Sequence, residues 1–170
     1  TGAVDHEKLA HLVETAFTLK ANDNVAPITP VTPSTGQQII IPKDISQAHL
    51  CIGGAGIPYH DPRKYALYVL NTILGGGMTS RLFQSIREQA GLAYAIYSDV
   101  EFCYDTGLVS IYAGTDVEDV PRVLDSIYHE INKMRTVPVS DLELRDAKSQ
   151  LTGGLLLSME SASTVMNRMA

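Results

Sequence analysis

Residues 93–114 impose the strongest constraint on what this 170-residue chain can fold into. In 93–103, apolar side chains recur at every second position, which is the period of a half-buried strand. Asp105-Thr106-Gly107 then supplies residues that are typical of a tight turn. Residues 108–114 follow as a second apolar run. The pattern predicts a β-hairpin and therefore an antiparallel sheet.

Two helices are expected before the hairpin. Asp61-Pro62 is typical of a helix start, and the apolar residues that follow keep helical spacing as far as about residue 74. Gly75-Gly76-Gly77 ends this pattern, and 79–89 predicts a second helix that Gly91 would terminate. The glycine run lacks the G-K-[ST] ending of a phosphate-binding loop, so we interpret it as a sharp turn.

Two more helices are expected after the hairpin. Thr115 and Ser140 each begin a capping-box sequence, and helical spacing continues behind both. The second of these helices is expected to run on to about Arg168. With a further strand expected at 46–53, the order of elements predicts an α+β fold, in which helices pack on one face of a mainly antiparallel sheet.

The first residues are expected to be separate from this body. Residues 5–20 predict an amphipathic helix capped by Asp5. Residues 21–37 contain three prolines among Asn, Thr and Ser, and this composition indicates a linker. The main domain is therefore expected at 38–170. Because helical spacing is still running at the last residues, we expect the chain to be a piece of a longer protein.

Composition and charge exclude several classes. The formal net charge is −6 and no basic run occurs, so a nucleic-acid partner is not expected. No stretch approaches the ~20 apolar residues that span a bilayer, so we expect no membrane partner. Cys51 and Cys103 are too few for a disulfide framework, and we expect them to pack as small hydrophobes. The residues do not specify a compartment, and we take the cytoplasm as the working expectation.

No metal site is expected within this chain. His6 and His11 resemble the zinc motif H-E-x-x-H, but a separation of five residues turns their side chains about 140° apart on a helix. His49 and Cys51 point the same way on a strand, yet two ligands are insufficient for zinc. The motif H-x-x-E-H is absent from the sequence. We therefore expect no catalytic residue and no bound cofactor in these 170 residues.

Arg87 and Tyr94 are the candidate site residues. They flank the turn between a predicted helix and the first hairpin strand, so both side chains could reach one space. A guanidinium and a phenol together suit the carbonyl oxygen of an extended peptide. The alternative is structural, with Arg87 paired to Glu88 or Glu101 and Tyr94 filling the core. Spacing alone leaves both interpretations open.

The stretch VLNTILGGGMTSRLFQSIREQAGLAYAIYS, residues 69–98, resembles the second half of the pitrilysin and mitochondrial-processing-peptidase family, the inverzincins. The most specific part is L-G-G-G-x-x-S-R-L-F combined with R-E-x-x-G-L-A-Y. The likeness extends over 44–54, which is similar to the family's opening strand, and over 141–160, which is similar to its long helix. It covers nearly the whole chain.

The resemblance implies a zinc endopeptidase built from two similar halves. In such proteins the first half binds zinc through H-x-x-E-H and a distal Glu, whereas the second half has no zinc and closes over the substrate. The second half supplies an Arg and a Tyr that bind the peptide near the scissile bond, and these positions match Arg87 and Tyr94. The resemblance thus implies that residues 1–20 are the last helix of the catalytic half, 21–37 the linker, and 38–170 a truncated non-catalytic domain.

Two functions follow as expectations. The leading one is the substrate-binding half of a zinc-dependent endopeptidase that cleaves peptides or presequences, with zinc in the parent protein and this piece inactive alone. The alternative is a non-catalytic homologue that acts as a scaffold subunit beside an active peptidase. The expected partners are a peptide substrate and a catalytic half, in the same chain or in a homologous subunit. The sequence also leaves a homodimer open as an alternative partnership.

Overall fold

The computed structural model describes residues 3–17, 31–32 and 36–169. Most of the predicted linker, 21–37, and the end of the first predicted helix lie outside the described residues. The chain divides into two compact units, one made of 1–29 with 152–170 and the other of 30–151. The second unit holds the sheet, the core and both candidate site residues, and it is described first.

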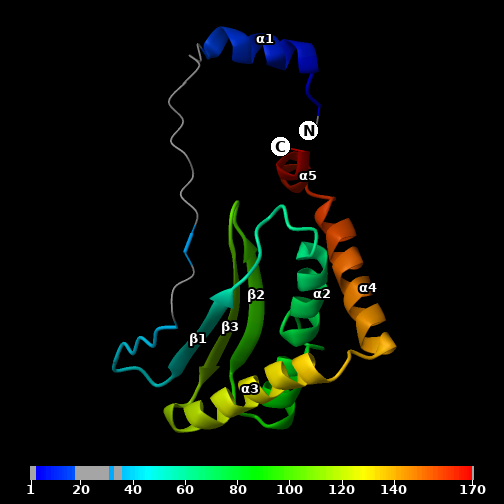
Figure 1. Cartoon of the computed structure of the whole chain (residues 1–170). Helices are drawn as coiled ribbons and strands as arrows, with labels where there is room; N and C mark the ends of the chain where they lie inside the picture. The colour runs from blue at the N-terminus through cyan, green and yellow to red at the C-terminus, as the bar shows by residue number, and fades with distance from the viewer. Residues whose placement is uncertain (1–2, 18–30, 33–35, 170) are drawn as a thin grey trace. The chain divides into compact units, whose positions relative to one another are not determined.

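Three strands form one antiparallel sheet in the order β1-β3-β2 (Figure 1). They are β1 (Ala48–Ala55), β2 (Ala95–Phe102) and β3 (Gly107–Thr115). β2 and β3 are the two arms of the predicted hairpin, which is confirmed. β1 pairs with the other edge of β3, and this register places Leu50 and Ile96 on either side of Ala113.

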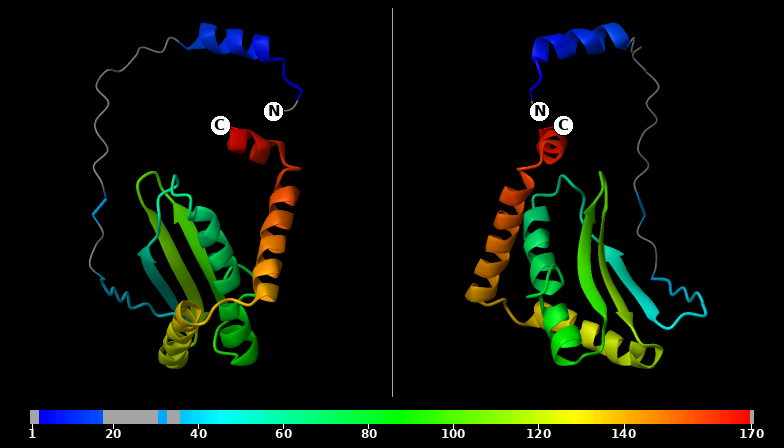
Figure 2. Two further views of the ribbon diagram at one scale, coloured as in Figure 1. Left: turned by 45° about the vertical axis from the view of Figure 1, so that its right-hand side comes forward. Right: turned by 180° about the vertical axis from the view of Figure 1, so that it is seen from behind.

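One face of the sheet is covered by helices. Along β2, Ile96 and Ser98 are buried, whereas Tyr97 and Asp99, which alternate with them, are exposed. This alternation is the pattern of a strand with one face in the core and one in solvent. Figure 2 shows α2 (Lys64–Leu74) and α3 (Val120–Thr136) beside the sheet. The predicted α+β class is therefore confirmed.

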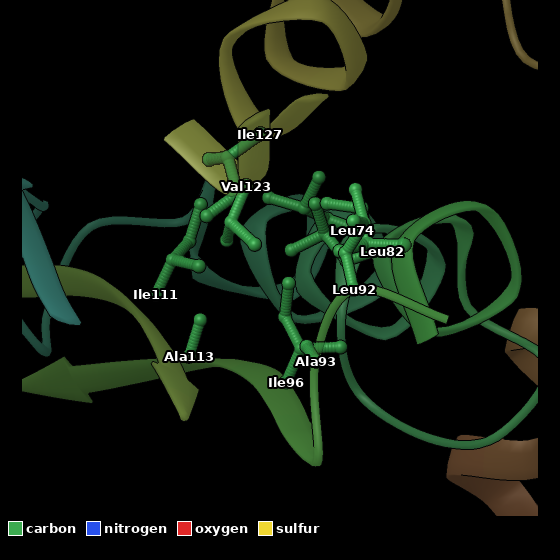
Figure 3. Packing of buried hydrophobic residues seen from close by; sticks show 10 residues of the cluster. Leu74, Leu82, Leu92, Ala93, Ile96, Ile111, Ala113, Val123 and Ile127 are labelled. Atoms are coloured by element: carbon green, nitrogen blue, oxygen red, sulfur yellow. The ribbon is translucent and has the colours of Figure 1, made fainter. Parts of the chain in front are cut away.

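The core joins the sheet to the helical segments. Ile86 lies within η1 (Phe83–Gln89), and Leu82 directly precedes it; both are fully buried. Val123 and Ile127 on α3 are fully buried as well. They pack into one cluster with buried strand residues, among them Ile96, Ile111 and Ala113 (Figure 3). Val123 and Ile127 are four residues apart and so share one face of α3, while Tyr128 on the same helix is exposed.

The capping box predicted at Thr115 is wrong. Thr115 is the last residue of β3, and its buried hydroxyl donates to the Leu92 carbonyl oxygen at 2.5 Å. A buried carbonyl without a partner would be costly, so this bond takes precedence over helix capping. The chain enters α3 through a single turn of 3₁₀ helix, η2 (Val117–Asp119), with Pro121 in the first turn of α3.

Two further helices differ in detail from the prediction. α2 begins at Lys64 rather than at Asp61-Pro62, because the Asp61 carboxylate accepts the backbone N–H of Arg63 at 2.8 Å and holds a turn there. Residues 83–89 form a π-helix, in which the Ala90 N–H bonds to the Ser85 carbonyl five residues earlier.

Gly91 ends this π-helix as predicted. Its φ of 64° lies in the left-handed region that favours glycine. The next residue, Leu92, returns its N–H to the Ile86 carbonyl at 2.9 Å. The reversal of chain direction between η1 and β2 is therefore closed by a backbone hydrogen bond.

The long final helix is interrupted. α4 (Asp141–Ser158) starts as predicted, with the Glu143 N–H bonded to the Ser140 hydroxyl oxygen at 3.3 Å. It stops at a tight turn over 159–161, and α5 (Ala162–Met169) follows as a separate helix. The continuous helix to Arg168 is thus wrong, because the serine-rich segment after 157 favours a new helix start over continued helix.

The first unit contains α1 (His6–Ala16), which Asp5 caps through the Lys8 N–H at 3.1 Å as predicted. Its apolar residues Leu9, Leu12 and Val13 are exposed. Within the part of the chain that the structure describes, no helix is long and apolar enough to cross a membrane.

Candidate functional site

Arg87 and Tyr94 stand at the two ends of the junction between η1 and β2. Arg87 lies in the last turn of η1, and Tyr94 directly precedes β2. The residues between them are anchored, because Leu92 and Ala93 are buried and the Tyr94 N–H donates to the Gly114 carbonyl oxygen at 2.8 Å. Both side chains are nevertheless exposed. The junction therefore presents these two side chains from a fixed backbone.

The Arg87 guanidinium rests on an aromatic ring. Its central carbon lies 4.7 Å from the centroid of the Phe83 ring, a cation–π contact along one helical turn. Over the described ranges, Arg87 forms an ion pair neither with Glu88 or Glu101 nor with any other carboxylate. The ion pair of Arg87 with Glu88 or Glu101, which the structural interpretation expected, is therefore not present among the described residues. The planar N–H donors of Arg87 remain available to a ligand.

Tyr94 does not fill the core. Its side chain is 54% exposed, and its hydroxyl donates to both carboxylate oxygens of Asp116 at 3.0 Å. This hydrogen bond, together with the negative charge of Asp116, raises the pKa of the Tyr94 phenol above its ordinary value. The phenol is therefore held in its protonated form beside a carboxylate.

Asp116 is the residue that the sequence analysis missed. It follows β3 directly, and the sequence placed it inside a presumed capping box. Its tertiary partner comes from 22 residues earlier in the chain. The one available signal was the hairpin register, which pairs Ala95 with Gly114 and so brings the residues beyond each strand end close together.

A cavity of about 320 Å³ opens beside Phe83. It is lined by the turn Gly75–Met78, by Phe83 and by Ile96–Ser98 of β2. Its polar groups are partly engaged, since the Ser98 hydroxyl donates to the Asn71 side-chain oxygen at 2.7 Å. Phe83 thus has two environments: it lines this cavity and it supports the Arg87 guanidinium.

The residues in hand do not fit a zinc site. Among the described residues, no three His, Cys, Asp or Glu side chains come close enough together to hold a metal ion. His6 and His11 are exposed on α1. His49, on β1, instead shares a hydrogen bond of 2.7 Å between its Nδ1 and the Tyr112 hydroxyl. No chemical step is therefore assigned to a metal held by this chain.

Helices that cover one face of an antiparallel sheet define an α+β domain, and the described part of the chain brings no metal-binding cluster together. Residues 1–151 match the family described as the Peptidase M16 inactive domain. The chain belongs to this family, which is the second half that the sequence resemblance indicated.

Known proteins agree with this assignment. An uncharacterized zinc protease of Streptomyces coelicolor is 36% identical over 175 residues, which cover 98% of this chain and 38% of that protein. A protease from Helicobacter pylori shares the fold at a TM-score of 0.83 and 22% identity, over 96% of this chain and 41% of that one. A chain of Complex III2 from Candida albicans, with Inz-5 bound, reaches a TM-score of 0.81 at 22% identity, over 98% and 42% respectively.

The domain is thus the inactive half found in proteins named as zinc proteases. The chain spans about two fifths of the length of the curated relative described above.

Proposed function

We propose that this domain is the substrate-binding half of a zinc-dependent endopeptidase. The observation that carries the proposal is the junction between η1 and β2, where an Arg87 guanidinium without an ion pair among the described residues and an exposed Tyr94 project from an anchored backbone. Guanidinium N–H groups are suited to peptide carbonyl oxygens and to negative charge that develops on them. A zinc ion belongs, in this proposal, to the catalytic half of the intact protein.

The family supports the proposal without supplying its details. The Streptomyces coelicolor relative is named a zinc protease, and its length leaves room for a second half beside the region matched here. The role of this domain would be to hold a peptide against the catalytic half and to exclude water from the reacting bond. Contacts to the peptide backbone would position the scissile bond, so the loss of such a contact should reduce turnover.

The test is a pair of substitutions in the intact protein. Arg87→Ala and Tyr94→Phe should each reduce kcat/KM for a peptide substrate by roughly tenfold, because each removes a charged or polar contact to the bound chain. Their melting temperatures should stay close to that of the wild type, since both side chains are exposed.

Matched controls separate a local effect from a general one. Arg135→Ala removes an exposed Arg of α3, and Tyr128→Phe removes an exposed phenol from the same helix. Both controls should turn over peptide at the wild-type rate. Turnover that is unchanged in Arg87→Ala and Tyr94→Phe would exclude these residues from substrate binding.

A second candidate function is a scaffold subunit that pairs with an active peptidase. The observation in its favour is the likeness in fold to a chain of Complex III2 from Candida albicans. The two functions differ in the parent reading frame, because only a self-sufficient peptidase needs H-x-x-E-H in the same protein. Peptidase assays of the intact protein alone, and then mixed with an active homologue, distinguish them directly.

A further inference from the structure

We propose that Asp116 is a positioning residue that makes the Tyr94 hydroxyl an acceptor for a backbone N–H of the bound peptide, rather than a donor to one of its carbonyls. The inference rests on the proposed function, because it concerns the same peptide. It assigns opposite tasks to the two site residues, with Arg87 donating and Tyr94 accepting.

The Asp116 carboxylate points to Tyr94 and not to the helical turn that follows it. An Asp directly before a helical turn commonly accepts a backbone N–H of that turn. Asp116 precedes η2 with an extended backbone, yet its side chain caps nothing there. The Asp119 N–H bonds to the backbone carbonyl of Asp116 instead, at 3.1 Å. The carboxylate is therefore free to bind Tyr94, which it does through both oxygens.

The single phenolic proton of Tyr94 can serve only one acceptor at a time. A phenol has one O–H to donate and two lone pairs to accept with. The single proton of Tyr94 is directed to Asp116. A hydrogen bond to a carboxylate is roughly twice as strong as one to a neutral acceptor, so a peptide carbonyl would not displace Asp116 from this proton. What Tyr94 can offer to a ligand is its lone pairs.

The charges around Tyr94 and Asp116 also favour this hydrogen bond. Asp116 has no ion pair over the described ranges, and the neighbouring Arg122 is bonded to Asp119 at 2.8 Å. No cation among the described residues competes with the Tyr94 O–H for the Asp116 carboxylate, which is a further reason for the proton to stay. The raised pKa of the Tyr94 phenol agrees, since a phenolate beside this carboxylate is disfavoured.

The result is a site that distinguishes the two polar groups of a peptide bond. Arg87 has donors only and selects a carbonyl oxygen. Tyr94 with its proton committed selects an N–H. An extended backbone presents both groups, whereas an ester bond presents only the carbonyl. The site should therefore prefer amides over esters at one non-scissile position.

The experiment is an ester scan of one peptide substrate on the intact protein. Each non-scissile amide is replaced in turn by an ester, which removes one N–H. At one position the ester should lower kcat/KM of the wild type roughly fivefold, the value expected for one lost hydrogen bond. In Tyr94→Phe the same ester should have no further effect, whereas in Arg87→Ala the sensitivity should persist.

Asp116 is tested by the same scan. In Asp116→Ala the phenolic proton is released and can be donated to a peptide carbonyl instead, so the ester sensitivity at that position should fall. Asp116→Asn keeps an oxygen that accepts the proton and should restore most of the sensitivity, which a merely structural role would not predict. Asp125→Ala removes an exposed carboxylate of α3 and should behave as the wild type. Melting temperatures accompany every variant.

The outcomes distinguish the two proposals. If Tyr94→Phe turns over peptide as the wild type does, the proposed role of Tyr94 in binding is wrong. If Tyr94→Phe is impaired but no ester position affects the wild type, Tyr94 binds as a donor and the present inference is overturned. Ester sensitivity that is undiminished in a folded Asp116→Ala would also overturn it. Reduced ester sensitivity in Asp116→Ala, with recovery of that sensitivity in Asp116→Asn, would support the inference.

Discussion

Gly75 shows how a single residue fixes the approach of two elements. It follows α2, and its carbonyl oxygen accepts the N–H of Ser98 on β2 at 3.1 Å. A Cβ at this position would lie 2.4 Å from the Ser98 nitrogen and 2.5 Å from its hydroxyl oxygen. No side chain fits there, so glycine is required by close approach rather than by its backbone angles.

Gly75→Ala should therefore destabilise the fold. The added methyl group must push β2 away from the end of α2, and overpacking of this kind costs about 1–3 kcal/mol. Urea unfolding followed by circular dichroism measures the change. Gly153→Ala is the matched control, because a Cβ at Gly153 meets nothing within 4 Å and alanine favours helix. Equal stability of the two variants would contradict this account of Gly75.

Individual residues also show how far the sequence could lead. Gly91 was predicted as a helix terminator because it directly follows the last residues with helical spacing, where glycine is favoured, and the structure confirms it. Thr115 and Asp116 were misjudged because their partners, Leu92 and Tyr94, lie more than 20 residues away. Local patterns record local hydrogen bonds, and these two bonds are tertiary.

At the scale of elements, an ion pair links Arg81, two residues before η1, to Glu143 in the first turn of α4. Arg81 Nε lies 2.6 Å from Glu143 Oε1 and its Nη2 lies 2.8 Å from Oε2, which is a bidentate geometry. The side chains are 14% and 31% exposed. The hydrogen bond to Arg81 lowers the pKa of Glu143 below its ordinary value of about 4.5. The pair therefore stabilises the folded state only while Glu143 is ionised.

Glu143→Gln should lower the free energy of unfolding by about 1–3 kcal/mol at pH 7, because Arg81 loses a charged partner while partly buried. The pH dependence follows from the sign of the shift. The folded pKa is depressed, so the contribution is complete above the unfolded pKa and disappears as pH falls through the folded one. The difference in the free energy of unfolding between the wild type and Glu143→Gln should therefore disappear in that acidic range.

Denaturant titrations at several pH values test this expectation. Asp146→Asn is the control, because its ion pair with Arg145 is exposed and long, at 3.9 Å, and contributes little. A gap between wild type and Glu143→Gln that stays constant down to strong acid would show that the pair does not titrate as described.

The sequence predicted element types better than element details. Period-two alternation and helical spacing identified the hairpin, α2 and α3, because burial of one face imposes those periods. The π-helical geometry of 83–89 has no such signature, since it adds a residue to the turn without changing which side chains are apolar. The break between α4 and α5 was missed for a different reason: helical spacing continues across it, while the serines that start α5 act locally.

At the scale of the molecule, fold and function were predicted on different grounds. Composition and periodicity were sufficient for the α+β class. They left Arg87 and Tyr94 undecided between binding and structure, and only the resemblance favoured binding. The structure adds what neither could supply, namely that Arg87 rests on Phe83 and that Tyr94 is bonded to Asp116. Those contacts turn a likeness in sequence into a chemical hypothesis about one site.

The proposed function assigns the zinc requirement to the catalytic half of the intact protein and not to this domain. Among the described residues no three ligands lie close enough together to hold a metal ion, so we expect the domain to keep its fold without zinc. Chelator should abolish peptide turnover by the intact protein, and added zinc should restore it. The same chelator should leave the melting temperature of chain 1–170 unchanged, because a structural zinc site would contribute on the order of 10 kcal/mol and its loss would be unmistakable. A lower melting temperature in chelator would place a metal within this chain and contradict the division of roles; turnover that resists chelator would contradict the zinc-dependent mechanism instead.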